Sequence, residues 1–175
     1  ETGAKLVKKI NDGKIEEVEL ISLSSSDMSL YVAEGMALAN YQFLKYFSNP
    51  EKKRNSLKAI FVNAKSSAIH KMNAVVSGTI YARDFINEPL SYLTAIQFSE
   101  DMLALGKEAG FKVEVLHKKQ IESLKMGGLL AVNQGSLEPP TFNILKYKPE
   151  NHTNSKPFVL VGKGIVYDTG GLSLK

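Results

Sequence analysis

The sequence predicts an α/β protein, because segments with helical and strand-like patterns alternate along its 175 residues. Helices are expected where apolar residues recur every three or four positions, and strands where short apolar runs end at glycine, proline or asparagine. Such alternation is typical of helices that cover a largely parallel sheet. One predicted helix, over residues 66–87, is long enough to link two domains, although a plain buried helix has the same pattern.

The first half of the chain is predicted to contain two strands and two helices. Residues 15–22 have a weak strand pattern, and the serine-rich segment 24–27 offers side chains that can cap a helix start. Apolar side chains at helical spacing continue this helix as far as Asn49-Pro50. Residues 57–63 are predicted to form the second strand, and the helix over 66–87 follows it.

The second half is predicted to begin with a helix that Thr94 caps and Gly110 ends. Strands, a short helix and a glycine-containing segment should follow. The expected ranges are 111–116, 141–147 and 157–162 for the strands, 119–125 for the short helix and 126–135 for the glycine-containing segment. The polar residues 148–157 are expected to form an exposed loop.

Composition restricts the function classes. Hydrophobic residues at 43% and charged residues at 23% are normal for a folded globular protein. The net charge of +4 is mild and the densest basic cluster is Lys52-Lys53-Arg54, so the sequence does not predict a nucleic-acid partner. The absence of cysteine excludes disulfides and thiolate metal sites. No apolar stretch approaches the roughly 20 residues of a membrane span, and we expect a cytoplasmic protein without a membrane partner.

Several histidine and aromatic side chains are expected to have ordinary structural roles. No two histidines have the spacing of metal ligands, so His70, His117 and His152 are expected at the surface or in packing. A cluster of aromatic residues is expected on the first long helix, in the core or at an interface. Its members are Tyr41, Phe43, Tyr46 and Phe47.

The segment at 158–175 contains the strongest functional signal. An apolar run, Phe158 to Val161, is expected to be a buried strand, and it ends at Gly162-Lys163-Gly164. Chemistry in α/β proteins is usually found where such strands end. The two glycines allow the backbone to approach a ligand or an ion closely.

Three charged residues of this segment are candidates for chemistry. Lys163 and Asp168, five residues apart, fit either a surface ion pair or a hard-metal site with a carboxylate ligand. Lysine binds a metal only as a neutral amine. Lys175 fits either an exposed lysine or a fixed cation that stabilises an oxyanion. Residue spacing alone leaves these alternatives open.

The literal sequence of this segment, VGKGIVYDTGGLSLK over 161–175, closely resembles the metal-site segment of the leucyl aminopeptidase (cytosol aminopeptidase) family. Two upstream segments resemble the same family in the same order. ARDFINEP over 82–89 is similar to its junction between the amino-terminal and catalytic domains, and MGGLLAVNQGS over 126–136 is similar to the start of its catalytic domain. The resemblance covers about residues 80–175.

The resemblance implies a metal-dependent exopeptidase that removes amino-terminal residues from peptides, with leucine preferred. Two divalent ions, zinc or manganese, share a water that attacks the peptide carbonyl in that family. Carried over to this sequence, Lys163 is a ligand of one ion, Asp168 bridges both, and Lys175 is the catalytic lysine. Gly170 and Gly171 fit the tight loop that presents these groups. A homo-hexamer and a bound bicarbonate are also implied.

The resemblance further implies a division of the chain into three parts. Residues 1–65 correspond to the carboxyl-side part of an amino-terminal α/β domain, 66–89 to a linking helix, and 90–175 to the first part of a mixed-sheet catalytic domain. The family's remaining carboxylate ligands and its arginine have no match here. We therefore expect a chain truncated at both ends, and a 175-residue polypeptide that is inactive by itself.

Other function classes agree less well with the sequence. A non-catalytic assembly or DNA-binding module of such a protein remains an alternative, because the net charge is positive. The sequence contains neither the Gly-x-Ser-x-Gly elbow of an α/β hydrolase nor a glycine-rich phosphate loop that ends in Lys-Ser or Lys-Thr.

Overall fold

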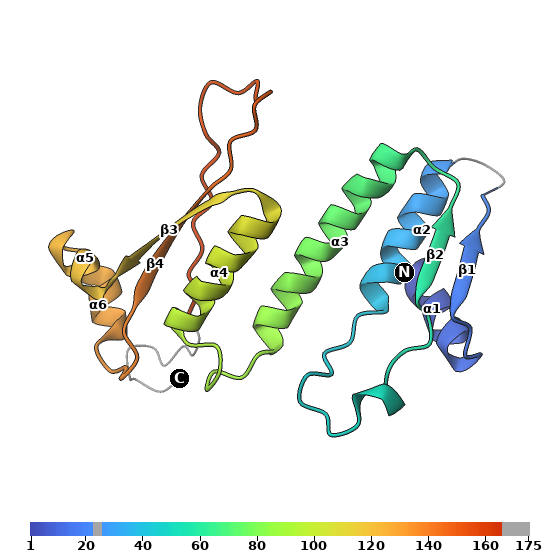
Figure 1. Ribbon diagram of the computed structural model, residues 1–175, viewed down its shortest axis with the longest axis horizontal. Helices are drawn as coiled ribbons and strands as arrows, with labels where there is room; N and C mark the ends of the chain where they lie inside the picture. The colour runs from blue at the N-terminus through green and yellow to red at the C-terminus, as the bar shows by residue number, and fades with distance from the viewer. Residues whose placement is uncertain (23–25, 166–175) are drawn as a thin grey trace. The chain divides into compact units, whose positions relative to one another are not determined.

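The computed structural model describes residues 1–22 and 26–165 and confirms the predicted α/β class (Figure 1). The chain divides into two compact units, Glu1–Asn87 and Glu88–Lys175. The predicted three-part division of the chain into domains stays a prediction. No helix in the described ranges is both long and apolar enough to cross a membrane.

The first unit packs helices against a parallel pair of strands, in which Val18 is opposite Ile60. The helix α3 has the predicted bounds, and both strands lie within their predicted ranges. The elements are α1 (Thr2–Asp12), β1 (Glu17–Leu20), α2 (Ser26–Ala39), the 3-10 turn η1 (Pro50–Lys52), β2 (Ala59–Val62) and α3 (Ser66–Asn87).

The core of the first unit forms where α1, α2 and β2 meet. Val7 of α1, Met36 of α2 and Leu57, just before β2, are buried against one another. Helices α1 and α2 approach so closely that a Cβ at Gly3 would lie 2.6 Å from the Met36 nitrogen. The close approach therefore requires glycine at position 3. Helix α1 is not predicted from the sequence, although Leu6, Val7 and Ile10 have helical spacing.

The predicted end of α2 is wrong, because the helix ends at Ala39 rather than near Asn49-Pro50. The side chain of Asn40 donates to the Leu57 carbonyl at 2.9 Å, and Asn55 Nδ2 donates to both the carbonyl and the Oδ1 of Asn40. The Asn40 N–H still donates to the Met36 carbonyl, but the Asn40 carbonyl accepts from the Asn55 side chain, in the place of the next helical N–H. The four residues of the predicted aromatic cluster therefore lie in the loop that follows α2 and not on the helix.

The second unit contains a helix packed on an antiparallel pair of strands, in which His117 is opposite Thr141. Its first helix has the predicted bounds, and its Thr94 hydroxyl accepts from the Gln97 N–H at 3.2 Å. Gly110 ends that helix with a φ of 77°, which favours glycine. The elements are α4 (Ala95–Ala109), β3 (Lys112–His117), α5 (Lys118–Ser123), α6 (Gly127–Asn133) and β4 (Thr141–Lys146).

Three features of the second unit add to or correct the expectations. Its two described strands are antiparallel, whereas the alternation of elements favoured a largely parallel sheet; the expected mixed sheet allows both. The glycine-containing segment forms the helix α6 over most of its length. The predicted buried strand over 157–162 is absent, since the side chains of Phe158 and Leu160 are 92% and 96% exposed. A strand needs a hydrogen-bonded neighbour, and neither sheet of the described residues includes this segment.

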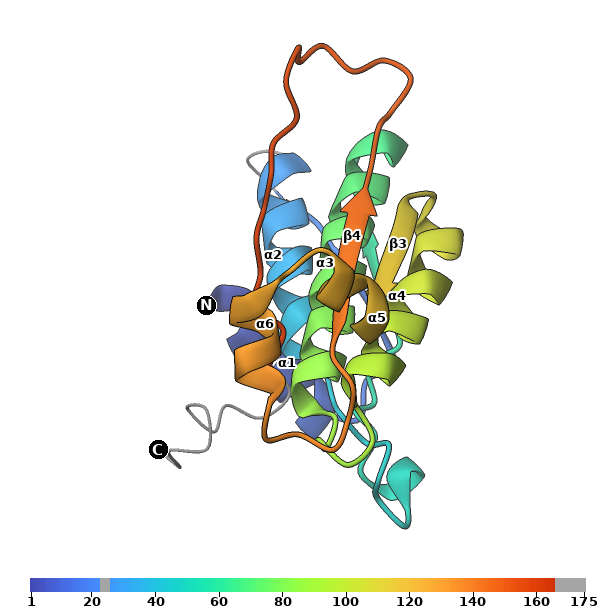
Figure 2. The same ribbon diagram turned by 90° about the vertical axis from the view of Figure 1, so that its left-hand side faces the viewer.

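The loop after β4 confirms the expectation of an exposed polar segment. All residues of 148–157 are exposed. Figure 2 shows the chain leaving β4, extending as a long loop and returning past the sheet. Local hydrogen bonds order the loop, among them Asn154 Nδ2 to the Lys156 carbonyl at 2.7 Å. The loop separates β4 from the returning segment that contains Lys163.

Candidate functional site

Lys163 is the one predicted site residue that lies within the described ranges. It is exposed and lies between Gly162 and Gly164 on the segment that returns after the polar loop. A Cβ at Gly164 would lie 3.9 Å from Cε1 of Phe98, so the segment passes beside α4. At Gly162 a Cβ would meet nothing within 4 Å. Lys163 therefore lies on an open part of the second unit.

The other predicted site residues lie outside the described residues. These are Asp168, Gly170, Gly171 and Lys175. The structure therefore places Lys163 but does not test whether it approaches the predicted carboxylate or the predicted catalytic lysine. The metal and catalytic roles of all three charged residues remain predictions.

The described residues do not form a metal centre by themselves. No group of three or more histidine, aspartate or glutamate side chains comes together within 1–22 and 26–165 in a way that could hold an ion. His70, His117 and His152 are all exposed, on α3, at the end of β3 and in the polar loop. Any metal bound at Lys163 would need ligands from beyond the described residues.

The family-like segment over 82–89 forms a hydrogen-bonded cluster in the last turns of α3. The Tyr41 hydroxyl donates to Asp84 Oδ1, and Asn87 Nδ2 donates to the Tyr41 oxygen at 3.1 Å. The Arg83 guanidinium donates to the Leu38 carbonyl and lies 5.4 Å from the centre of the Tyr41 ring. We call Tyr41, Arg83, Asp84 and Asn87 the Tyr41 cluster. The sequence did not predict the Tyr41 cluster, because Tyr41 is distant from α3 along the chain.

Burial raises the pKa of Tyr41 above its ordinary value, and the hydrogen bond to Asp84 raises it further. The cluster contains a carboxylate, a guanidinium and an amide, and each has a partner within the first unit. Because these groups bind one another, the cluster fits a structural role and offers no group for catalysis.

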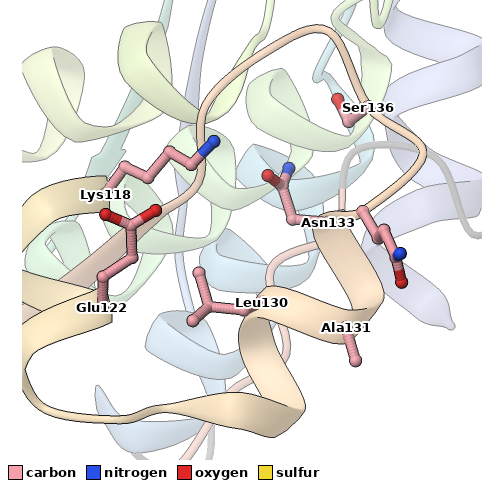
Figure 3. Close-up of a pocket in the computed structure, with 7 residues that line it drawn as sticks. Lys118, Glu122, Leu130, Ala131, Asn133 and Ser136 are labelled. Carbon is pink, nitrogen blue, oxygen red and sulfur yellow. The ribbon is translucent and has the colours of Figure 1, made fainter.

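The family-like segment over 126–136 forms α6 and one wall of an open hollow (Figure 3). Figure 3 shows Lys118 and Glu122 of α5 on one side and Leu130 and Asn133 of α6 on the other. The amide of Asn133 already donates to the Glu138 carbonyl at 3.0 Å. Both charged lining residues are exposed, so water competes for any polar ligand there.

Comparisons with known proteins identify what the chain is similar to. The model of the cytosol aminopeptidase family, catalytic domain, matches residues 80–175. A probable cytosol aminopeptidase of Chloroherpeton thalassium is 36% identical over 201 residues, which cover 98% of this chain and 39% of that protein. The chain spans about two fifths or less of the length of the first curated relatives that it matches.

Two solved structures have a fold similar to that of this chain. The bottromycin maturation enzyme BotP in complex with Mn is 28% identical, with a TM-score of 0.72 over 85% of this chain and 32% of that chain. A mutant of tomato leucine aminopeptidase is 22% identical, with a TM-score of 0.81 over 97% of this chain and 37% of that chain. At this identity the second likeness shows the fold alone.

Proposed function

The chain belongs to the cytosol aminopeptidase family, and on that premise we propose that the whole protein is a metal-dependent aminopeptidase that releases amino-terminal residues from peptides. The observation that carries this proposal is the match of the family's catalytic-domain model to residues 80–175. That range includes Lys163, Asp168 and Lys175. The alternative of a non-catalytic assembly or DNA-binding module is not favoured, because the match falls on the catalytic domain.

We assign different roles to the two lysines. Lys163 would hold a metal ion as a neutral amine, which requires a desolvated setting beside a cation. It is exposed among the described residues, so the proposed role requires that residues beyond those described cover it. Lys175 acts as the charged ammonium that stabilises the developing oxyanion. Asp168 would supply a carboxylate that helps to hold the ions.

The proposed cofactors are two divalent ions, zinc or manganese, which when bound supply an activated water and polarise the scissile carbonyl. Manganese has support from the BotP structure, which contains Mn. The described residues do not provide a sufficient ligand set, so we place the missing ligands in the whole protein. We further propose leucine preference, a bicarbonate held by an arginine outside this chain, a homo-hexamer and a cytoplasmic location.

Leucine p-nitroanilide hydrolysis by the whole protein tests the function. We expect turnover that a chelator abolishes and that added manganese or zinc restores. Lys163→Arg should lower kcat by about 10²-fold or more, because a guanidinium cannot become a neutral ligand. Lys175→Arg keeps the charge but moves it, and should also lower kcat. Lys148→Arg, in the exposed polar loop, is the matched control and should leave kcat unchanged.

The 175-residue polypeptide alone should show no turnover and should bind less than one metal ion per chain by elemental analysis. It contains at most two of the proposed ligands, Lys163 and Asp168, and two ligands hold an ion weakly. Metal-independent hydrolysis by the whole protein, or full activity of Lys163→Arg, would refute the proposed function.

A further inference from the structure

The loop between α2 and β2 exposes aromatic rings that the proposed function does not use. We call residues 43–54 the aromatic–basic loop. The side chains of Tyr46 and Phe47 are 54% and 45% exposed. The Phe43 and Tyr46 rings are in contact, with centroids 5.8 Å apart. Large exposed aromatic side chains that lie together often mark an interaction site.

Cationic side chains accompany these rings. Lys53 Nζ lies 4.4 Å from the centre of the Phe47 ring, and Lys45 Nζ lies 5.6 Å from the centre of the Tyr46 ring. The loop contains four cationic side chains and one carboxylate. That carboxylate, Glu51, is paired with Arg54 at 2.8 Å. The surface of the loop is therefore both aromatic and positively charged.

The loop is braced from both sides, so its surface is formed before any partner binds. Gln42 Nε2 donates to the Lys53 carbonyl at 2.9 Å, and the Asn55 N–H donates to Gln42 Oε1 at 2.7 Å. Asn55 also donates to the Asn40 carbonyl at the end of α2. The 3-10 turn at Pro50–Lys52 shortens the path between these braces. Such preorganisation lowers the entropy cost of binding.

We propose that the aromatic–basic loop binds an acidic peptide segment in which an apolar side chain lies between carboxylates. Carboxylates of the segment pair with Lys52 and Lys53, and the apolar side chain covers the exposed rings of Tyr46 and Phe47. Charge complementarity selects an acidic partner, and the rings add an apolar contact that salt does not screen.

A short peptide agrees better with the loop than a nucleic acid does. A single strand is usually held in a charged groove that follows its backbone, with bases stacked on open ring faces. Here four cationic side chains lie within one short loop, and the loop also contains the carboxylate of Glu51. The loop therefore offers a compact surface rather than a groove.

Fluorescence anisotropy with a defined probe tests the proposal. The probe is a fluorescein-labelled peptide with a phenylalanine between two pairs of glutamates, acetylated so that an aminopeptidase cannot shorten it. We expect saturable binding that weakens about tenfold or more in the double variant Lys52→Glu, Lys53→Glu, and about fivefold in Phe47→Ala. The charge-matched double variant Lys148→Glu, Lys156→Glu should bind the peptide with a Kd within twofold of that of the original chain.

Two further probes decide the class of partner. A labelled 20-nucleotide oligothymidine and vesicles that contain phosphatidylserine should each bind more weakly than the acidic peptide. Tighter binding of either probe, or loss of peptide binding in the Lys148, Lys156 double variant, overturns the proposal. Equal binding of a peptide with alanine in place of phenylalanine also overturns it. Hydrolysis of leucine p-nitroanilide by the whole protein should be unchanged in Phe47→Ala, which separates this surface from the proposed active site.

Discussion

The hydroxyl of Tyr41 donates a 2.7 Å hydrogen bond to Oδ1 of Asp84 and so joins the end of α2 to the last turn of α3. Asn87 and Arg83 complete the Tyr41 cluster from the same helix. These residues belong to the segment that resembles the family's domain junction. The cluster therefore stabilises the first unit at the point where the chain leaves it.

Removing the Tyr41 hydroxyl should change the pH dependence of stability. Tyr41→Phe should cost about 2 kcal/mol of unfolding free energy at pH 7, because the hydrogen bond to the Asp84 carboxylate and the one that Asn87 donates are both lost. The pKa of Tyr41 is raised in the folded state, by burial first and then by Asp84. Its stabilisation is therefore complete below the unfolded value near 10.0 and is lost as the pH rises through the folded value.

Urea unfolding of both proteins at pH 7, 9 and 11, followed by circular dichroism, measures this difference. The difference in unfolding free energy between the original chain and Tyr41→Phe should be equal at pH 7 and 9 and smaller at pH 11. Lysine titration affects both proteins equally. If this difference is unchanged or larger at pH 11, the pKa of Tyr41 is not raised in the folded state.

The guanidinium of Arg83 satisfies a carbonyl in the last turn of α2. Arg83→Met keeps the apolar stem but removes the donor to the Leu38 carbonyl and the contact with the Tyr41 ring. We expect a loss of about 1–2 kcal/mol in unfolding free energy. Lys71→Met, at an exposed position of the same helix, should change stability by less than about 0.5 kcal/mol. Equal stability of the two variants would exclude a helix-end role for Arg83.

Two glycines of the first unit should respond in opposite directions to alanine. At Gly3 the added Cβ would lie 2.6 Å from both the Met36 nitrogen and the Val32 carbonyl oxygen, so α1 must move away from α2. Gly3→Ala should lower the unfolding free energy by about 1–3 kcal/mol. At Gly78 of α3 a Cβ meets nothing within 4 Å. Gly78→Ala should therefore raise the unfolding free energy by about 0.5–1 kcal/mol. Thermal unfolding of both variants checks the signs.

The Asn40 side chain connects three segments. It accepts from Asn11 Nδ2 at 3.1 Å and from Asn55 Nδ2 at 2.9 Å, and it donates to the Leu57 carbonyl. Asn40→Ala removes all three bonds and should cost about 1–3 kcal/mol. Asn151→Ala, in the exposed loop, should stay within about 0.5 kcal/mol of the original chain in urea unfolding. A small effect at Asn40 would show that water replaces these bonds.

The helices with local start and stop signals were predictable from sequence. Thr94 and Gly110 define α4, and the turn at Asn87-Glu88-Pro89 ends α3. The end of α2 was not predictable, because Asn40 is bound by residues 29, 15 and 17 positions away along the chain. Periodicity describes neighbours in sequence and cannot detect such bonds.

The apolar run at 158–161 failed as a strand prediction for a related reason. Its composition is that of a buried strand, but burial and pairing depend on a neighbouring strand. The candidate site was predictable only through the resemblance of the segment that contains Lys163. The spacing of Lys163 and Asp168 fits an ion pair as well as a metal site, so spacing alone does not identify the site.

The exposed apolar run Phe158–Val161 also has a consequence for handling the molecule. This uncharged run pairs with no strand in the described part of the chain, and such a run favours intermolecular pairing and aggregation. Lys156-Pro157 on one side and Gly162-Lys163 on the other act as gatekeepers against such stacking. Replacing Lys163 by a neutral residue would thus weaken solubility as well as any metal ligation. Arginine at this position keeps the protective charge, so Lys163→Arg separates loss of chemistry from loss of soluble protein.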